Sequence, residues 1–280
     1  MRAGYFGPPG TFTEEALLSS APDGVEPVPF PTIHATIAAL ADGSVRRAVV
    51  PIENALEGSV DATLDALVVD TQDVVIVDEV VRPISHCLIA APGTTLEQIR
   101  VVASHPQALG QCVRFLRATL PGARLQSADG STADAVRMVA STPEPGWAAI
   151  GTRLAAQLYG CEVLREGIED HPGNQTRFVW LARADARVQL QAQRWKTSVV
   201  FWGGGDATPG WLVDCLSELA RREVNLTRIE SRPRRIGLGH YMFFVDLEGH
   251  ARTPPVAAAL SALAGHCEGL RTLGTYPAAG

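Results

Sequence analysis

The sequence predicts an α/β protein in two parts, a larger two-lobed domain followed by a smaller domain. Over residues 1–183, short apolar stretches rich in β-branched residues alternate with helical patterns, which is typical of a largely parallel sheet with right-handed crossovers. A polar, unpatterned stretch at 184–196 indicates a linker. Beyond it, residues 197–274 follow the order strand, helix, strand, strand, helix, strand. A length of 280 residues also favours more than one domain.

The composition is that of an ordinary globular protein, 46% hydrophobic and 19% charged. The net charge of −6 comes without a basic stripe or an acidic tail, so neither nucleic acid nor an anionic membrane is indicated as a partner. No apolar run approaches the roughly 18–20 residues that span a bilayer. Because Met1 leads almost directly into a strand-like segment, we expect no signal peptide.

The five cysteines are odd in number, widely scattered and never in CxxC spacing. This pattern favours reduced thiols in a cytoplasmic enzyme over a zinc site or a disulfide framework. Cys112 and Cys215 fall within apolar helical patterns, and we expect both in hydrophobic cores.

The first predicted elements form a strand, a glycine loop and a helix. The strand covers 2–6, the loop covers 7–10, and residues 11–14 resemble a capping box that opens a helix through Ser19. Unpaired N–H groups point out of a helix start, so this arrangement favours an anion, with Thr11 as a candidate contact. The loop is neither GxGxxG nor a P-loop, so a small carboxylate suits it better than a nucleotide.

A polar loop follows the third predicted strand. Strands are expected at 25–30 and 48–50, with a helix between them that is capped by Thr32. The loop 51–60 then carries two acids, an amide and a hydroxyl where a parallel strand ends, the usual place for ligand contacts in open α/β sheets. Asn54 is the functional candidate because an amide donates and accepts without adding charge. Ser59 is expected to be a helix cap.

Strand-like residues at 74–81 and 84–90 carry the chain into a second lobe. After a strand at 101–103, Ser104 is predicted as an N-cap with proline just inside the helix. Ser104, Gln107 and Gln111 would then lie along one helix face, as a polar site or as plain solvent exposure. His105 is either an acid or base or a helix-start residue bonded to backbone.

Two further strands and two helix caps complete this lobe, at 124–127 and 148–151 with caps at 131–132 and at Thr152. The chain then returns through 167–172 to the first lobe. The chain is therefore expected to form two lobes, one at about 1–80 plus 167–183 and the other at about 81–166, and to cross between them twice. This arrangement predicts a hinged cleft like that of a periplasmic-type binding protein.

The returning stretch, residues 174–178, lies at the entry of the apolar strand 179–181. Because side chains alternate along a strand, Asn174, Thr176 and Phe178 would share one face and Arg177 would take the other. An amide, a hydroxyl and an aromatic ring aimed at one place suit a small polar ring compound. The alternative is a purely structural junction with a capping asparagine.

Five motifs closely resemble those of prephenate dehydratases, in the same order and over nearly the whole chain. They are GPPGTFTEEA (7–16), PIENALEGSV (51–60), SHPQALGQC (104–112), NQTRF (174–178) and NLTRIESRP (225–233). The resemblance implies a two-lobed catalytic domain and a ferredoxin-like ACT domain that binds phenylalanine. It implies conversion of prephenate to phenylpyruvate, water and carbon dioxide, without metal or organic cofactor.

The resemblance also assigns residues. Thr176 is the residue on which turnover depends, and Asn54, Ser104 and Gln111 match active-site polar residues. Gln107, Ser131 and Thr132 are further candidates. Because a threonine hydroxyl is too weak an acid to ionise near neutrality, we expect Thr176 to donate a hydrogen bond to the leaving oxygen. Arg177 is either a carboxylate clamp or a partner in an ion pair that braces the lobes.

One departure concerns the effector pocket that the resemblance implies. The family usually has Gly-Ala-Leu at the start of the first ACT helix, whereas this chain has Gly210, Trp211 and Leu212. The other implied contacts are intact: Asn225, Glu230, Ser231, Arg232 and Pro233. A tryptophan adds on the order of 150–250 Å² of side-chain surface. We therefore expect weakened or shifted phenylalanine control, unless Trp211 points into a subunit contact.

Three other functions stay open at this point. Arogenate is an alternative substrate, a bilobal protein that only binds small carboxylates is an alternative class, and a related decarboxylase would be expected to lack Thr176. A homodimer or homotetramer paired through ACT domains is expected. Because the chain begins at the first strand of the dehydratase part, no chorismate mutase region is expected before it.

Overall fold

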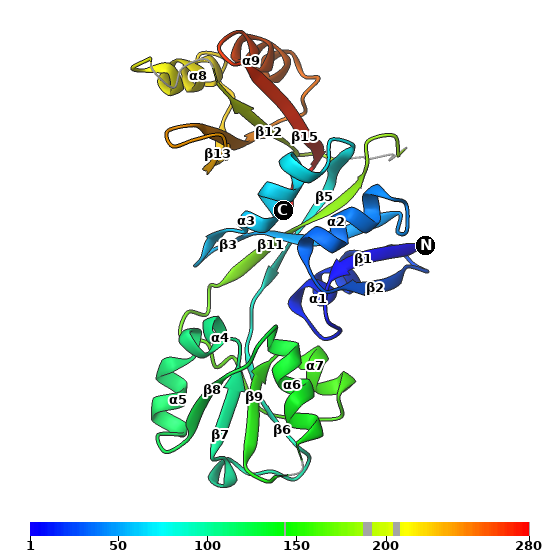
Figure 1. Cartoon of the computed structure of the whole chain (residues 1–280), viewed down its shortest axis with the longest axis vertical. Coiled ribbons are helices and arrows are strands. Elements are labelled where there is room, and N and C mark those ends of the chain that lie inside the picture. Colours follow the sequence, from blue (N-terminus) through cyan, green and yellow to red (C-terminus); the bar gives the residue numbers. More distant parts are fainter. Residues whose placement is uncertain (143, 187–191, 204–207, 280) are drawn as a thin grey trace. The chain divides into compact units, whose positions relative to one another are not determined.

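The computed structural model describes residues 1–142, 144–186, 192–203 and 208–279 (Figure 1). Contacts divide the chain into two compact units. The first unit comprises Met1–Thr36, Val49–Gly58 and Val81–Phe178, and the second comprises Ile37–Ala48, Ser59–Val80 and Val179–Gly280. Residues 187–191 of the predicted linker lie outside the described residues. The domain boundaries stay a prediction.

The N-terminal elements of the chain follow the predicted order. Strands β1 (Arg2–Phe6) and β2 (Glu26–Phe30) pair in parallel around helix α1 (Phe12–Ser20). Helix α2 (Ile33–Ala41) follows, with Thr32 Oγ1 accepting from the Ala35 N–H as predicted for a cap. Strand β3 (Arg47–Asn54) is longer than expected. Asn54 is therefore the last residue of a strand rather than part of a loop.

The remainder of the first unit contains a five-stranded sheet in the order β10-β6-β9-β7-β8. Its strands are β6 (Cys87–Ala90), β7 (Val101–Ser104), β8 (Arg124–Ser127), β9 (Trp147–Gly151) and β10 (Glu162–Glu166). Strands β7, β8 and β9 are parallel, but β6 runs antiparallel to β9 and to β10. Strand β10 therefore runs in the same direction as β7, β8 and β9, and the prediction of a largely parallel sheet is wrong for β6 alone. A crossover helix makes the two strands that it joins parallel. Strand β6 follows β5 (Val74–Pro83), which is not in this sheet, and β6 pairs with β9 and β10, which come much later in the chain.

Helices cover both faces of this sheet (Figure 1). Helices α4 (Pro106–Gln111) and α5 (Val113–Thr119) share a core with Leu88, Val102 and Ile150. Helices α6 (Thr132–Ser141) and α7 (Arg153–Leu158) pack on the other face with Ile89 and Ala149. Successive residues of one strand thus enter opposite cores, as the alternation of side chains along a strand requires. Cys112 is fully buried among the first set, as predicted.

The C-terminal part of the second unit has the predicted βαββαβ order. It comprises β12 (Trp195–Trp202), α8 (Trp211–Ala220), β13 (Leu226–Pro233), β14 (Tyr241–Glu248), α9 (Pro254–Gly265) and β15 (Gly269–Pro277). The antiparallel strands lie in the order β13-β14-β12-β15. Both helices pack on one core with Val199, Phe201 and Cys215, the last as predicted. The α/β class with a smaller βαββαβ domain is confirmed.

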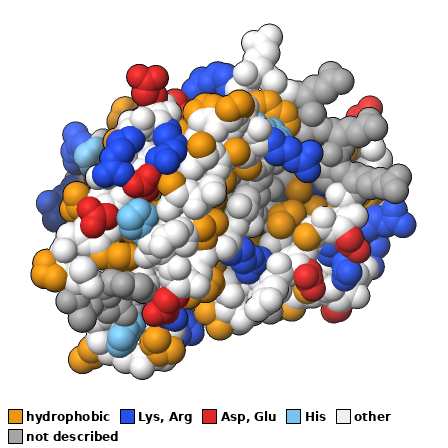
Figure 2. Space-filling view, turned by 90° about the horizontal axis from the view of Figure 1, so that it is seen from above, with side chains coloured by type: hydrophobic (Ala, Val, Ile, Leu, Met, Phe, Trp, Pro, Cys, Tyr) orange, Lys and Arg blue, Asp and Glu red, His pale blue; other side chains and the backbone are white. Residues whose placement is uncertain are grey.

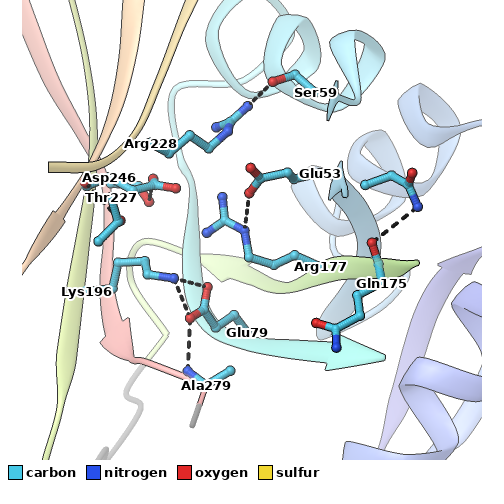
Figure 3. A network of polar contacts seen from close by, with 12 residues as sticks. Glu53, Ser59, Glu79, Gln175, Arg177, Lys196, Thr227, Arg228, Asp246 and Ala279 are labelled. Atoms are coloured by element: carbon cyan, nitrogen blue, oxygen red, sulfur yellow. Dashed lines mark hydrogen bonds and ion pairs between the residues drawn. The ribbon is translucent and has the colours of Figure 1, made fainter. Parts of the chain in front are cut away.

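Earlier segments complete the second unit. They are the short strand β4 (Gly58–Ser59), helix α3 (Asp61–Asp65), the π-helix Ala66–Asp70 and most of β5. Strand β15 pairs with β5 at Gly274 and Ile76, and a Cβ at Gly274 would overlap the Ile76 carbonyl. Lys196 Nζ bonds both Glu79 carboxylate oxygens, at 2.7 and 2.9 Å (Figure 3). The C-terminal sheet is therefore joined to β5 by backbone and charge.

Acidic, basic and apolar side chains are interspersed over the face that Figure 2 presents. All five cysteines are free thiols in the structure. Among the residues that the structure describes, every helix is too short or too polar to cross a lipid bilayer.

Candidate functional site

A hydrogen-bonded network in the first unit begins at Asn54. Its Oδ1 accepts the backbone N–H groups of Leu56 and Glu57, at 3.0 Å each. Because a backbone N–H only donates, these two bonds fix which way round the amide lies. Asn54 Nδ2 therefore faces Asn174 Oδ1 and Thr176 Oγ1, both at 2.9 Å. The candidates from strand β3 and from strand β11 (Gln175–Arg183) are thus brought together.

The direction of this network determines what the Thr176 hydroxyl can do. Its oxygen accepts from Asn54 Nδ2, so its own hydrogen must point elsewhere. Within the described part of the chain, the structure shows no second side-chain hydrogen bond for Thr176. The residue is 8% exposed, so a donor held there is largely shielded from water.

Gln111, the last residue of helix α4, joins the same network. Its Nε2 donates to Glu57 Oε1 at 3.3 Å, and a carboxylate only accepts, so the amide orientation is again determined. Gln111 Oε1 then receives Asn174 Nδ2 at 3.3 Å and His86 Nε2 at 3.0 Å. Residues predicted for the site and one acid of the 51–60 motif therefore form one chain of bonds.

His86 is a member of this network that sequence reasoning missed. It lies between β5 and β6, and its ring edge meets Phe12 with centroids 5.6 Å apart. Its backbone N–H donates to Glu169 Oε2 at 2.8 Å. Burial lowers the pKa of His86 below its usual value. A lone histidine between two strands carries no spacing signal, so sequence patterns had no means of finding it.

Arg177 lies beside Glu53, with Nε 3.0 Å from Glu53 Oε2 (Figure 3). The arginine side chain is 8% exposed and the glutamate 38%. Of the two predicted roles, this geometry supports the ion pair, and contact with a substrate stays a prediction. The sequence patterns do not identify Glu53 as a functional residue. The signal that could have identified it is its position in the acidic 51–60 motif, one residue before Asn54.

Phe178 is 1% exposed and belongs to the hydrophobic core. The predicted face shared by Asn174, Thr176 and Phe178 is therefore polar only at its first two members. A substrate contact for Phe178 stays a prediction.

The prediction that Ser104 caps a helix is wrong. Ser104 is the last residue of β7, is fully buried, and donates to the Ile150 carbonyl at 2.7 Å. His105 is the N-cap instead, accepting the Gln107 N–H at 3.3 Å, as the backbone-bonded alternative expected. Pro106 occupies the first helical position, which places the cap one residue before it. Ser104 thus lies outside the helix, whereas Gln107 and Gln111 are four residues apart within it, and Gln107 is exposed.

Other predicted contacts are engaged in helix caps. Ser131 forms a capping box with Asp134 and Thr132 begins helix α6. Thr11 accepts the Glu14 N–H at 3.4 Å and donates to the Phe6 carbonyl at 3.3 Å. The Gly10 N–H binds the carboxylate of Glu14. The protein's own carboxylate therefore occupies one donor of the predicted anion pocket, and a ligand contact at Thr11 stays a prediction.

The implied effector residues lie at the start of α8 and along β13. Gly210 is the left-handed N-cap of α8, with φ 87°. Trp211 Nε1 donates to the His266 carbonyl at 2.6 Å, and its ring lies 6.1 Å from that of Phe201 and 5.9 Å from that of Phe243. The indole is anchored within its own domain. Leu212 is half-buried and Asn225 is exposed.

Three side chains of the β13 motif bind the segment 59–65 of the same unit. Glu230 Oε2 accepts from Ser59 Oγ at 2.7 Å, and Arg228 also bonds this hydroxyl (Figure 3). Arg232 pairs with Asp61 and with Asp65, at 2.5 and 3.0 Å. Ser231 and Pro233 are exposed. Among the described residues, no three His, Cys, Asp or Glu side chains are grouped to hold a metal ion.

Comparison with known proteins places these features in a family. The prephenate dehydratase family profile matches residues 3–186, and the ACT domain profile matches residues 206–265. A prephenate dehydratase of Mycolicibacterium vanbaalenii is 40% identical over 98% of this chain and 90% of that relative. A relative from Amycolatopsis methanolica with the same name is 37% identical over 98% of this chain and 88% of its own length.

Two solved structures are also similar. Prephenate dehydratase from Arthrobacter aurescens, described as a complex with L-Phe, is 36% identical with a TM-score of 0.89, covering 99% of this chain and 90% of that one. GqqA, described as a novel type of quorum quenching acylase, is 32% identical with a TM-score of 0.89, covering 100% and 98%.

Proposed function

Because the chain belongs to the prephenate dehydratase family, we propose that it converts prephenate to phenylpyruvate with loss of carbon dioxide and water. This is a hydro-lyase reaction of L-phenylalanine biosynthesis. The observation that supports it here is the bond from Asn54 Nδ2 to Thr176 Oγ1, which leaves the threonine hydrogen available as a donor.

The proposed chemistry needs a donor at one atom of the substrate. Prephenate is a dianion on a cyclohexadiene ring. When its ring carboxylate leaves as carbon dioxide, the electron pair of the broken C–C bond enters the ring and expels the hydroxyl, which departs as water after gaining a proton. Thr176 O–H donates to that oxygen as the C–O bond breaks, and solvent water supplies the proton. General-acid help of this kind is typically worth about 10²–10⁴ in rate.

Uncharged groups suit the remainder of the site. Amides and hydroxyls fixed by other bonds stabilise developing charge without binding the ground-state dianion too tightly. Asn54, Asn174 and Gln111 are fixed in this way and are the proposed substrate contacts. Ser104, Ser131, Thr11, Gln107, Thr132 and Phe178 also stay candidates for substrate contact.

A turnover assay tests the proposal. Purified protein is given prephenate or arogenate, and phenylpyruvate is followed by its absorbance in alkali while phenylalanine is quantified by chromatography. We expect phenylpyruvate from prephenate. If only arogenate is turned over, giving phenylalanine, then arogenate and not prephenate is the substrate. If neither compound is turned over, the dehydratase assignment is refuted in favour of a binding protein.

We also propose that L-phenylalanine regulates this enzyme through the ACT domain, at Gly210 to Leu212 and at Asn225 and Glu230 to Pro233. The L-Phe complex of the Arthrobacter aurescens relative supports this. The proposal includes pairing of ACT domains into a homodimer or homotetramer, and a cytoplasmic location. It also includes the domain boundaries: a catalytic domain at 1–183, a linker at 184–196 and an ACT domain at 197–274.

A further inference from the structure

His86 is a buried histidine whose two ring nitrogens have different surroundings. The residue is 3% exposed. Its Nε2 lies 3.0 Å from Gln111 Oε1, whereas its Nδ1 has no hydrogen-bond partner among the residues described. Burying a polar atom without a partner costs folding free energy, so its retention calls for a compensating role.

The tautomer of His86 follows from its neighbours. Gln111 Nε2 must face the Glu57 carboxylate, so Gln111 Oε1 faces the imidazole and only accepts. His86 Nε2 therefore carries the hydrogen. Burial disfavours the charged ring, which leaves Nδ1 as a bare lone pair.

We propose that His86 is a positioning residue for the dehydratase site: its Nε2–H, together with the Glu57 carboxylate, holds the Gln111 amide in the orientation on which the bonds from Asn174 to Asn54 and Thr176 depend. Every amide in this network has a determined orientation, with two donors meeting at Gln111 Oε1 and two acceptors served by Asn54 Nδ2. His86 and Asn174 both donate to Gln111 Oε1, Asn54 donates to Asn174 Oδ1, and Asn54 also donates to Thr176. This inference rests on the role proposed above for Thr176.

Loss of the His86 Nε2 donor would leave the Glu57 carboxylate and Asn174 Nδ2 as the only groups that hold the Gln111 amide in this network. If the Gln111 amide turned over, its Nε2 would face Asn174 Nδ2, which is donor against donor. If Asn174 turned over in response, its Nδ2 would face Asn54 Nδ2, repeating the conflict. Asn54 is held by two backbone N–H groups, so the strain falls on the bonds next to Thr176.

The competing role for His86 is packing. Its ring meets Phe12 edge to face, at an interplanar angle of 79°. Three substitutions separate the two roles. His86→Gln keeps an N–H donor near the Nε2 position, His86→Asn places its amide near Nδ1 only, and His86→Phe keeps the ring without any donor.

The variants are compared with wild type on prephenate. We expect His86→Asn and His86→Phe to lower kcat by about 10–100-fold, because small misplacements at a site are costly, while His86→Gln stays within a few-fold of wild type. Thermal melting of each variant controls for folding. A tolerated phenylalanine together with a glutamine as poor as asparagine would show packing alone and overturn the proposal.

A double-mutant cycle tests the route of the effect. Because His86 acts through Gln111, His86→Phe should cost little further activity once Gln111→Ala is present. Full additivity of the two losses in kcat would contradict this route.

A measurement without turnover separates this inference from the proposed function. The ¹⁵N signals of the His86 ring at pH 7 report which nitrogen carries hydrogen. We expect protonated Nε2 and bare Nδ1, whether or not prephenate is the substrate. Hydrogen on Nδ1 would refute the His86 assignment, whereas failure of wild-type turnover would refute the dehydratase chemistry while this signature stood.

Discussion

At the scale of single residues, the Thr176 hydroxyl has its oxygen engaged and its hydrogen available. Thr176→Ala should lower kcat by about 10²–10⁴, equivalent to about 2.7–5.5 kcal/mol in the activation barrier. Thr176→Ser keeps the hydroxyl and should retain most of the turnover. Steady-state kinetics on prephenate measure both, and an alanine variant with wild-type kcat would rule out the donor role.

Asn54 allows a matched test in which shape is conserved. In Asn54→Asp, a carboxylate oxygen replaces the Nδ2 donor, so the Thr176 hydrogen is drawn toward the introduced carboxylate and away from the substrate. We expect kcat to fall about 10²–10³-fold, with thermal stability controlled by calorimetry. An aspartate variant as active as wild type would show that the direction of this bond is irrelevant to turnover.

His86 also predicts a pH dependence of stability. Burial lowers its folded-state pKa below 6.5, so between these two values the unfolded chain binds more protons than the folded one. Folding stability therefore falls as the pH drops through that window, by up to about 1.4 kcal/mol per pH unit, and levels off below the folded-state pKa. Urea titrations from pH 7.5 to pH 5 measure it.

His86→Gln is the control for this window. Glu169 and Glu57, the charged groups nearest the imidazole through its backbone and through Gln111, are present in both proteins. The difference between the two stability curves therefore isolates the histidine. If the stability curves of wild type and His86→Gln coincide, the pKa of His86 in the folded protein is the ordinary one, and the prediction is wrong.

At the scale of elements, strand β13 is joined to helix α3 through Arg232. Asp65 binds Arg232 and Arg235 and has 8% of its side chain exposed, whereas Asp61 has 54% exposed. Asp65→Asn should lower the free energy of unfolding by about 1–3 kcal/mol. Asp61→Asn, the matched control, should cost under about 1 kcal/mol because an exposed ion pair contributes little. Urea denaturation compares them, and equal losses would contradict this ranking.

At the scale of the whole molecule, Trp211 bears on regulation. Its indole is held by His266, Phe201 and Phe243, and Trp211 follows directly after Gly210, the N-cap of α8. We predict that Trp211→Ala strengthens L-phenylalanine binding by calorimetry and sharpens inhibition of prephenate turnover. Wild-type protein that binds L-phenylalanine tightly, with binding abolished by changes at Glu230 to Pro233, would contradict weakened control.

Much of the fold follows from local patterns. Strand β1 begins and ends where predicted, and Thr32, Ser131 and Thr152 cap helices as expected because a cap involves groups only a few residues apart. The error at Ser104 arose where two possible caps adjoin and the proline decides between them. The direction of β6 was missed because apolar spacing predicts a strand without predicting its neighbour.

The sequence by itself determined the α/β class, the order of elements and the polar residues from which a site would be made. Only the tertiary structure decided that Asn54 meets Thr176 across 122 residues of chain, and that a solitary His86 stands at the far end of their network. Propensity and capping act over a few neighbouring residues, whereas the polarity of a hydrogen-bonded chain depends on which donors and acceptors packing brings within about 3 Å of one another.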